Sequence, residues 1–284
     1  MEKKAYPIWL LCQVMQVSRS GFYSWKKRGE SARVKEREEL IPQIREIHQK
    51  ARGTYGSRRM AKAIESSTGC HCGRYKAATL MKLAGVEVRQ KKKFKATTDS
   101  KHNLPVAPNT LNRDFSVDRP NRVWVGDITY IWTLAGWLYL AVVIDLYSRM
   151  VVGWSVGRNM TKQLVIDAFL MAIWRRKPAP NLLFHSDRGS QYCSLAFQNL
   201  LEEYQIDSSM SRKGNCWDNA VAESFFGSLK NELIHGMRYT TRDQAKGDIV
   251  DYIEMFYNSR RLHSHLNYVS PADWERMTDL QKAA

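Results

Sequence analysis

Three acidic residues lie far apart in the sequence, in settings that could support metal-dependent chemistry. Asp127 lies in an otherwise apolar segment, Asp187 ends a short apolar stretch before a glycine, and Glu223 lies beside the apolar side of a helical segment. Hard divalent cations prefer carboxylate oxygens as ligands. Two such cations can activate a water or a 3′-hydroxyl and stabilise the leaving oxygen of a phosphodiester. Because this chemistry needs no covalent enzyme intermediate, we expect no nucleophilic serine or cysteine.

Each acid also has an ordinary interpretation: Asp127 could pair with an arginine, Asp187 could be a turn residue, and Glu223 could be a solvated helix residue. A buried carboxylate without a partner costs several kcal/mol, so Asp127 needs one, and a metal would serve. The joint occurrence of the three acids favours a shared site. Asp145 could replace Asp127 as a ligand, but Ser148 and Arg149 beside it offer local partners, so we interpret Asp145 as structural.

Several polar residues near the acids are candidates for contact with DNA. Lys230 follows Glu223 by seven residues, which on a helix places it about 10 Å along the same face, turned by roughly 20°. A lysine there is well placed for a phosphate. The other candidates in this region are Asn219, Arg188, Gln191 and His185. For His185 two interpretations stay open, since it could touch DNA or orient Asp187, or be a structural histidine with satisfied hydrogen bonds.

The segments that carry the acids alternate strands and helices. From residue 122 onward, β-branched and aromatic residues are enriched and predict strands. An amphipathic pattern over residues 162–176 predicts a helix. The further predicted strands are 137–145, 150–156, 182–184 and one near Ile206, and the further helices are about 194–204 and a long one through Glu223. This order predicts a mixed sheet flanked by helices.

The first third of the chain has a different character. Residues 1–104 hold 24 Lys and Arg against 9 Asp and Glu, whereas the remainder holds 20 against 19. Nearly all of the net charge of +16 therefore lies in this part, which favours a nucleic-acid partner over a merely soluble surface. Three short helices are predicted over 35–50, from a cap at Ser57 to Gly69, and over 75–84. They suit a helix-turn-helix fold.

Composition and the positions of glycine and proline divide the chain into four parts. Residues 1–34 form a basic N-terminal helical segment, and 35–89 form the helix-turn-helix-like domain. Residues 90–121 read as a basic linker with three prolines, in which Lys91, Lys92 and Lys93 are candidate DNA contacts. Residues 122–284 form the catalytic core with a C-terminal helix. No apolar run is long enough to span a membrane, and the start of the chain lacks the features of a signal peptide. The five scattered cysteines suit a reducing cytoplasm.

Several motifs together resemble the second-frame (OrfB) transposase subunit of bacterial IS-three-type insertion elements, relatives of retroviral integrases. The resemblance covers nearly the whole chain, and 35 residues separate Asp187 from Glu223, as in the family. The motifs are Gly-Phe-Tyr-Ser-Trp at 21–25, Tyr-Gly-Ser-Arg-Arg at 55–59, Trp-Val-Gly-Asp-Ile-Thr-Tyr at 124–130, Ile-Asp-Leu-Tyr-Ser-Arg at 144–149, His-Ser-Asp-Arg-Gly-Ser-Gln-Tyr at 185–192, Asn-Cys-Trp-Asp-Asn-Ala at 215–220, Glu-Ser-Phe-Phe at 223–226 and Tyr-Asn-Ser-Arg-Arg-Leu-His at 257–263. The second motif contains Arg58 and Arg59, two further candidate DNA contacts. The stretch Gly69-Cys70-His71-Cys72 departs from the family.

The resemblance implies an RNase H-like fold, a mixed five-stranded sheet flanked by helices, behind an all-α helix-turn-helix domain. It places Asp127, Asp187 and Glu223 on the family's three metal-binding acids, with two Mg²⁺ or Mn²⁺ ions. It also implies cleavage of double-stranded DNA at element ends and transfer of the 3′-hydroxyl to target DNA. An OrfA partner or fusion, a homo-oligomer on DNA and a cytoplasmic, nucleoid-associated location are expected. The alternatives are a DNA-binding regulatory or inactive subunit, and a plain nuclease of the same fold.

Overall fold

The computed structural model describes residues 6–88, 105–212 and 216–283, and the chain divides into two compact units. The smaller comprises residues 1–50 and 56–87, and the larger comprises residues 51–55 and 88–284. No described helix is both long and apolar enough to cross a bilayer.

The smaller unit is all-α. Helices α3 (Ala32–Lys50), α4 (Ser57–Thr68) and α5 (Arg74–Ala84) pack around buried Ile44, Met60 and Leu80. The guanidinium of Arg45 donates to the carbonyl of Ala84, which ties α3 to the end of α5. Two shorter helices, α1 (Ile8–Val14) and α2 (Arg19–Lys27), precede them and pack together. The three predicted helices are present, and α1 and α2 lie within residues 1–34, the segment predicted to be helical.

The ends of these helices follow local chemistry. Ser18 caps α2 by accepting a hydrogen bond from the Gly21 amide at 3.0 Å. Gly69 ends α4 in the left-handed conformation, at φ 70°, as predicted from its position after the apolar stripe. The predicted cap at Ser57 is wrong by one residue. Gly56 is the cap, and Ser57 is the first residue of α4 with no side-chain cap bond to the helix.

The larger unit is built on a five-stranded mixed sheet with the strand order β3-β2-β1-β4-β5. The three long strands β1 (Val123–Thr133), β2 (Gly136–Asp145) and β3 (Val151–Gly157) are antiparallel. The short strands β4 (Leu183–Ser186) and β5 (Asp207–Met210) add in parallel on the other side of β1. This is the predicted RNase H-like sheet.

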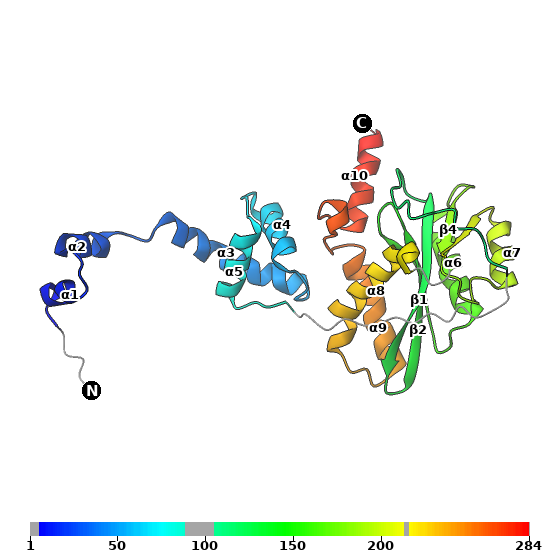
Figure 1. Ribbon diagram of the computed structural model, residues 1–284, viewed down its shortest axis with the longest axis horizontal. Helices are drawn as coiled ribbons and strands as arrows, with labels where there is room; N and C mark the ends of the chain where they lie inside the picture. Colours follow the sequence, from blue (N-terminus) through cyan, green and yellow to red (C-terminus); the bar gives the residue numbers. More distant parts are fainter. Residues whose placement is uncertain (1–5, 89–104, 213–215, 284) are drawn as a thin grey trace. The chain divides into compact units, whose positions relative to one another are not determined.

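One face of the sheet carries α6 (Lys162–Arg176) and α7 (Leu195–Glu203), as Figure 1 shows. The buried core on this face includes Trp124, Phe169, Phe184 and Phe197. Helix α6 lies unusually close to β3, because a Cβ added to Gly153 would lie only 2.1 Å from the carbonyl oxygen of Ala168. A glycine is required there by close approach of the two elements.

The opposite face carries α8 (Ala220–Glu232) and α9 (Arg242–Asp251) (Figure 1). A π-helical stretch, Tyr252–Tyr257, continues α9, and its aromatic side chains are buried. The chain ends in α10 (Pro271–Ala283). Arg261, before α10, is buried and makes two hydrogen bonds of 2.7 Å to the carboxylate of Glu232. It is therefore a packing residue and is not placed for DNA.

The described end of the predicted linker belongs to the larger unit. Leu111 is buried, and the amides of Thr110 and Leu111 both donate to the hydroxyl of Ser209 on β5. The interpretation of residues 90–121 as a tether is therefore wrong for residues 105–121. Residues 90–104, with Lys91, Lys92 and Lys93, lie outside the described residues.

Candidate active site

Asp127 lies near the middle of β1, on the strand that pairs with both β2 and β4. Its side chain is half-buried, and one carboxylate oxygen accepts from the amide of Ile128 at 2.8 Å. Immediately before it, Gly126 leaves no room for a side chain, since a Cβ there would lie 2.5 Å from the ring of Phe184. The aromatic core behind β1 thus fixes the backbone that carries Asp127.

The charges of the other two acids and of one lysine act on Asp127. Burial raises the pKa of Asp127 well above its usual range, and the negative charge of Asp187 raises it further. Glu223 acts in the same direction, whereas the ammonium of Lys230 lowers the pKa of Asp127. Asp187 and Glu223 therefore each disfavour a negative charge on Asp127, and the ammonium of Lys230 offsets part of that effect.

Asp187 lies in the loop directly after β4, where the parallel strands end. One of its carboxylate oxygens accepts from the amide of Gly189 at 2.9 Å, which fixes the side chain in a tight turn. A Cβ on Gly189 would lie 3.0 Å from that same oxygen, so the loop has little space for a larger residue. The turn therefore holds Asp187 at the carboxyl end of β4, the strand that pairs with β1.

Glu223 lies in the first turn of α8 and is exposed. Its carboxyl has a raised pKa because of desolvation by the surrounding protein. The start of α8 is joined to β1, since the side-chain amide of Asn219 donates to the carbonyl of Gly126 at 3.3 Å. This contact places the first turn of α8, and with it Glu223, beside the strand that carries Asp127.

The three acids do not form a closed ligand cluster in this conformation. Within residues 6–88, 105–212 and 216–283, no group of three or more His, Cys, Asp or Glu residues could hold a metal ion together. The donor set nevertheless fits a hard divalent cation, because all of its atoms are carboxylate oxygens. It also carries a surplus of negative charge, which disfavours the ionised form of Asp127. A cation between the acids would relieve that repulsion.

Lys230 lies on α8, two turns beyond Glu223, as its spacing predicts. Its ammonium also stands 5.2 Å from the centre of the Tyr130 ring, and burial lowers its pKa. Lys230 thus acts on Asp127 through its charge and contacts the ring of Tyr130 further along β1.

Two of the predicted DNA contacts are contradicted by burial. His185 has no exposed surface, and its two ring nitrogens lie 2.9 Å and 3.1 Å from the hydroxyls of Ser209 and Ser211. Burial lowers the pKa of His185 to about 4, which keeps the ring neutral. Asn219 is also buried and contacts Gly126. His185 therefore joins β4 to β5 and the residue after it, and Asn219 joins the start of α8 to β1.

The remaining candidates stay predictions. Arg188 and Gln191 lie in the loop of Asp187, half-buried, and donate to the carbonyls of Ser211 and Met160 respectively. In the smaller unit, Arg58 and Arg59 lie in the first turn of α4. Together with Gly56, Ser57 and Arg74 they line a surface hollow of about 280 Å³.

One buried carboxylate was not singled out from the sequence. Asp218, just before α8, is fully buried and accepts hydrogen bonds from Arg113, Arg212 and Asn109. The bonds from Arg212 above all hold the pKa of Asp218 far below its usual range. The motif at 215–220 contains this residue, but its arginine partners lie outside the motif. Asp218 is a positioning residue that anchors the start of α8.

Asp145, the possible replacement for Asp127, is structural. It is fully buried at the far end of β2 and accepts from the backbone amides of Asn121 and Tyr147 and from the indole of Trp124. Of the two predicted partners, Arg149 contacts Asp145 through the backbone, where its amide donates to the Asp145 carbonyl at 2.8 Å. The carboxylate also lies 3.8 Å from the guanidinium of Arg176. All of its oxygens are directed at the protein interior, so it is no ligand for the shared site.

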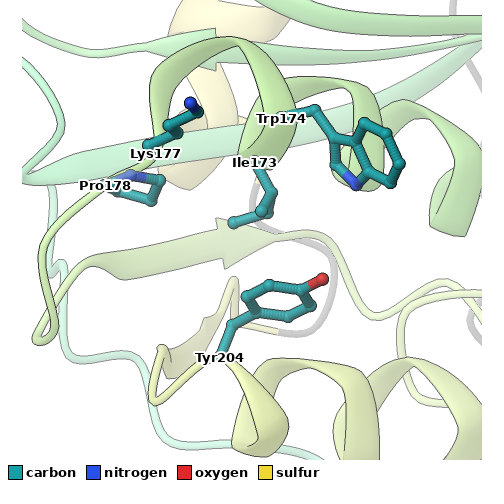
Figure 2. Close-up of a pocket in the computed structure, with 5 residues that line it drawn as sticks. All are labelled: Ile173, Trp174, Lys177, Pro178 and Tyr204. Atoms are coloured by element: carbon teal, nitrogen blue, oxygen red, sulfur yellow. The ribbon is translucent and has the colours of Figure 1, made fainter.

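A hollow of about 370 Å³ lies elsewhere, at the end of α6 (Figure 2). Its lining is mainly apolar and consists of Ile173, Trp174, Lys177, Pro178 and Tyr204. It contains no carboxylate, so the three acids do not belong to it.

Comparison with known families defines the class of protein. The integrase core domain family matches residues 117–216, which include Asp127 and Asp187. A second integrase core family matches residues 223–278, beginning at Glu223, and an HTH-like domain family matches residues 35–94. The larger unit therefore is an integrase-type catalytic core, and the smaller unit contains an HTH-like domain.

Relatives match along almost the entire chain. A 31 kDa protein of insertion element IS600 from Shigella sonnei is 47% identical over 92% of this chain and 96% of the relative. The transposase InsF for insertion sequence IS3A from Escherichia coli is 40% identical over 95% of this chain and 94% of the relative. The chain belongs to the IS3-type insertion element transposases, a family of DDE transposases.

Solved structures of viral integrases show a weaker likeness. The catalytic core of HTLV-2 integrase with magnesium matches at 22% identity and a TM-score of 0.44, over 55% of this chain and 97% of that chain. An intasome of simian T-cell lymphotropic virus, in complex with a PP2A regulatory subunit, matches at 19% identity and a TM-score of 0.48, over 76% of this chain and 73% of that chain.

Proposed function

We propose that Asp127, Asp187 and Glu223 bind two divalent cations, Mg²⁺ or Mn²⁺, and that this site cuts DNA at the ends of an insertion element and joins the new 3′-hydroxyl to target DNA. The observation that carries the proposal is where the chain places the three acids. Asp127 lies on β1, Asp187 follows the neighbouring strand β4, and Glu223 lies in the first turn of α8, whose start is joined to β1 by the bond from Asn219 to Gly126. The raised pKa of Asp127 supports this placement. Carboxylate oxygens are the ligands that hard divalent cations prefer, which supports a cation site at these three acids.

The chemistry is a pair of displacements at phosphorus. In the first, a water oxygen bonds to the phosphorus, the bond to the 3′-oxygen breaks, and a 3′-hydroxyl is released. In the second, that hydroxyl attacks a target phosphodiester, and another 3′-oxygen leaves. When bound, the cations would supply charge stabilisation at the attacking and leaving oxygens. The ammonium of Lys230 would balance the charge of a phosphate beside Asp127.

We also propose how the chain meets its DNA. The helix-turn-helix-like domain over residues 35–89 would contact phosphates through Arg58 and Arg59, and Arg188 and Gln191 would contact the strand near the acids. The high positive charge of the chain supports a polyanionic partner. Strand transfer at two element ends calls for more than one copy, so we expect a homo-oligomer on DNA, acting with an upstream-frame partner or as a fusion to it.

The test is cleavage and strand transfer on DNA that carries the ends of the element, with Mg²⁺ present. Asp127→Asn and Glu223→Gln should each lower the cleavage rate by more than about 100-fold. Losing a residue that only supports a metal ligand costs up to about 100-fold, and losing a ligand itself should cost more. Both variants should bind the same DNA as tightly as the wild type. Asp207→Asn, at an exposed acid on β5, is the matched control and should cut normally.

Each alternative function gives a different result. A regulatory subunit would bind the DNA but leave it uncut even when its partner protein is added. A plain nuclease would cut it without producing joined strands. If Asp127→Asn cuts as fast as Asp207→Asn, the assignment of the acids is wrong.

A further inference from the structure

We propose that an aromatic surface on the β1–β2 hairpin, formed by Tyr130, Trp132 and Trp137, binds unpaired DNA bases next to the three acids. The inference deepens the proposed function and rests on it, because it names the form of DNA that the site receives. We call these three side chains the hairpin aromatic surface.

The three rings form one continuous arrangement across the two strands. Trp132 and Trp137 face each other directly in the register of β1 and β2, with ring centres 4.8 Å apart and an angle of 72° between the rings. The ring of Tyr130 also contacts Trp137, with ring centres 5.1 Å apart and an angle of 86° between the rings. Trp137 is therefore held by two neighbours, so its indole is fixed before any ligand arrives.

Both tryptophans are largely accessible to solvent. Trp132 is 57% exposed, Trp137 is 44% exposed, and Leu134 in the turn between them is 73% exposed. Cross-strand aromatic pairs do stabilise hairpins. That role explains the contact between the rings, but it leaves a rigid apolar surface in water at the end of the sheet, the kind of surface that marks a binding site.

Two cations lie near the hairpin aromatic surface, one over a ring and one at the backbone of the hairpin. The ammonium of Lys230 stands over the ring of Tyr130 at 5.2 Å, and the guanidinium of Arg242 donates to the carbonyl of Trp137 at 3.0 Å. Aromatic rings that alternate with basic groups are the pattern of single-strand binding, in which bases stack and phosphates pair with cations. The phosphates between stacked bases would pair with these two cations, so charge complementarity favours DNA as the occupant.

The surface lies on the strand that carries Asp127. Alternation places Asp127 on the opposite face of β1 from Tyr130 and Trp132. Beyond Val125, however, the described part of β1 pairs with β2 alone, so this edge of β1 is open. The ammonium of Lys230 lies over the ring of Tyr130, and its charge acts on Asp127. At about 3.3 Å per residue, Tyr130 and Trp132 lie roughly 10 and 17 Å along the strand from Asp127. That span equals roughly three to five base steps of 3.4 Å.

The experiment measures binding by the full chain in EDTA, so that cleavage plays no part. The probes are a blunt duplex of the element end and the same duplex with a five-nucleotide overhang containing 2-aminopurine, in both strand polarities. The wild type should bind one overhang duplex at least about fivefold tighter than the blunt duplex and should quench the 2-aminopurine. Trp132→Ala and Trp137→Ala should lose both effects and keep the affinity for the blunt duplex, and Trp132→Phe should retain much of the preference.

Trp174→Ala is the control, because Trp174 is also exposed but lies near the end of α6 (Figure 2). That end of α6 approaches Asp145, at the opposite end of β2 from the hairpin turn. A preference for the overhang that persists in Trp132→Ala, or an equal loss for blunt and overhang duplexes, overturns the proposal. So does a change in oligomeric state in Trp132→Ala, since the surface would then be an interface between copies. Because no metal is present, these results stand apart from the test of the three acids.

Discussion

Replacing Gly153 with alanine tests whether the contact between β3 and α6 sets the position of the catalytic sheet. The added Cβ would lie 2.1 Å from the carbonyl oxygen of Ala168, 2.8 Å from the amide nitrogen of Ala172 and 2.8 Å from the Cβ of Ala172. Two of these atoms belong to the backbone of α6, so no side-chain rotation can relieve the clash.

The size of the effect follows from the distance that must be gained. Real Cβ contacts are essentially never shorter than 3.0 Å, so α6 or β3 must shift by close to the difference between 2.1 Å and 3.0 Å. Overpacking of this kind costs about 1–3 kcal/mol, and we expect the upper end because the whole helix must move. For a unit of about 200 residues this lowers the melting temperature by roughly 4–12 °C.

The assay is thermal and urea unfolding of the full chain, followed in the transition of the larger unit. Gly247→Ala is the matched control, since Gly247 lies inside α9 and a Cβ there would meet nothing within 4 Å. That substitution should stabilise the protein by about 0.5–1 kcal/mol through helix propensity. If Gly153→Ala is as stable as Gly247→Ala, the close approach of α6 to β3 is not a feature of the folded protein.

Three further predictions concern charged groups. Asp218→Asn should cost about 2 kcal/mol, because Arg212 loses its ionic partner and is itself half exposed. Because the pKa of Asp218 is lowered in the folded protein, its contribution to stability is fully present above about pH 4 and is lost as the pH falls further. Urea unfolding at several pH values should show that the free energy of unfolding depends less steeply on pH in the variant. Glu232→Gln should cost about 3–5 kcal/mol in urea unfolding by leaving buried Arg261 without its counter-charge, and a neutral result would refute this. Arg58→Gln should lower the slope of log affinity for DNA against log salt by about 0.9, measured by anisotropy, and an unchanged slope would exclude a phosphate contact.

The sequence predicts most of the larger unit because its elements follow local patterns. The helix over Lys162–Arg176 has the predicted bounds, and the strands of the hairpin are recognised by β-branched and aromatic residues. The acid in the middle of β1 was recognisable because a carboxylate there contradicts its apolar neighbours. Electrostatic coupling now supports the proximity of that acid to Asp187 and Glu223.

What the sequence does not predict depends on long-range contacts. Ser209 on β5 and Ser211 after it occupy both ring nitrogens of His185. Of its two predicted roles, the structure therefore favours the structural one, with a buried and neutral ring. Asp218 finds one of its arginines 105 residues away, at Arg113. That contact also explains why the segment before β1, rich in proline, packs on the core. Neither partner can be read from spacing along the chain.

The tight packing behind Gly126 fixes the backbone of Asp127, whereas the side chain of Glu223 is free to move. Phe184 and Tyr192 fill the space behind β1, so the backbone of Asp127 has no room to recede. Glu223, in contrast, is exposed and has a longer side chain. The proposed site must accept a water, a strand end and a target strand in turn. A fixed Asp127 on β1 and a mobile Glu223 side chain on α8 would let the site adjust to each of them from the helix side.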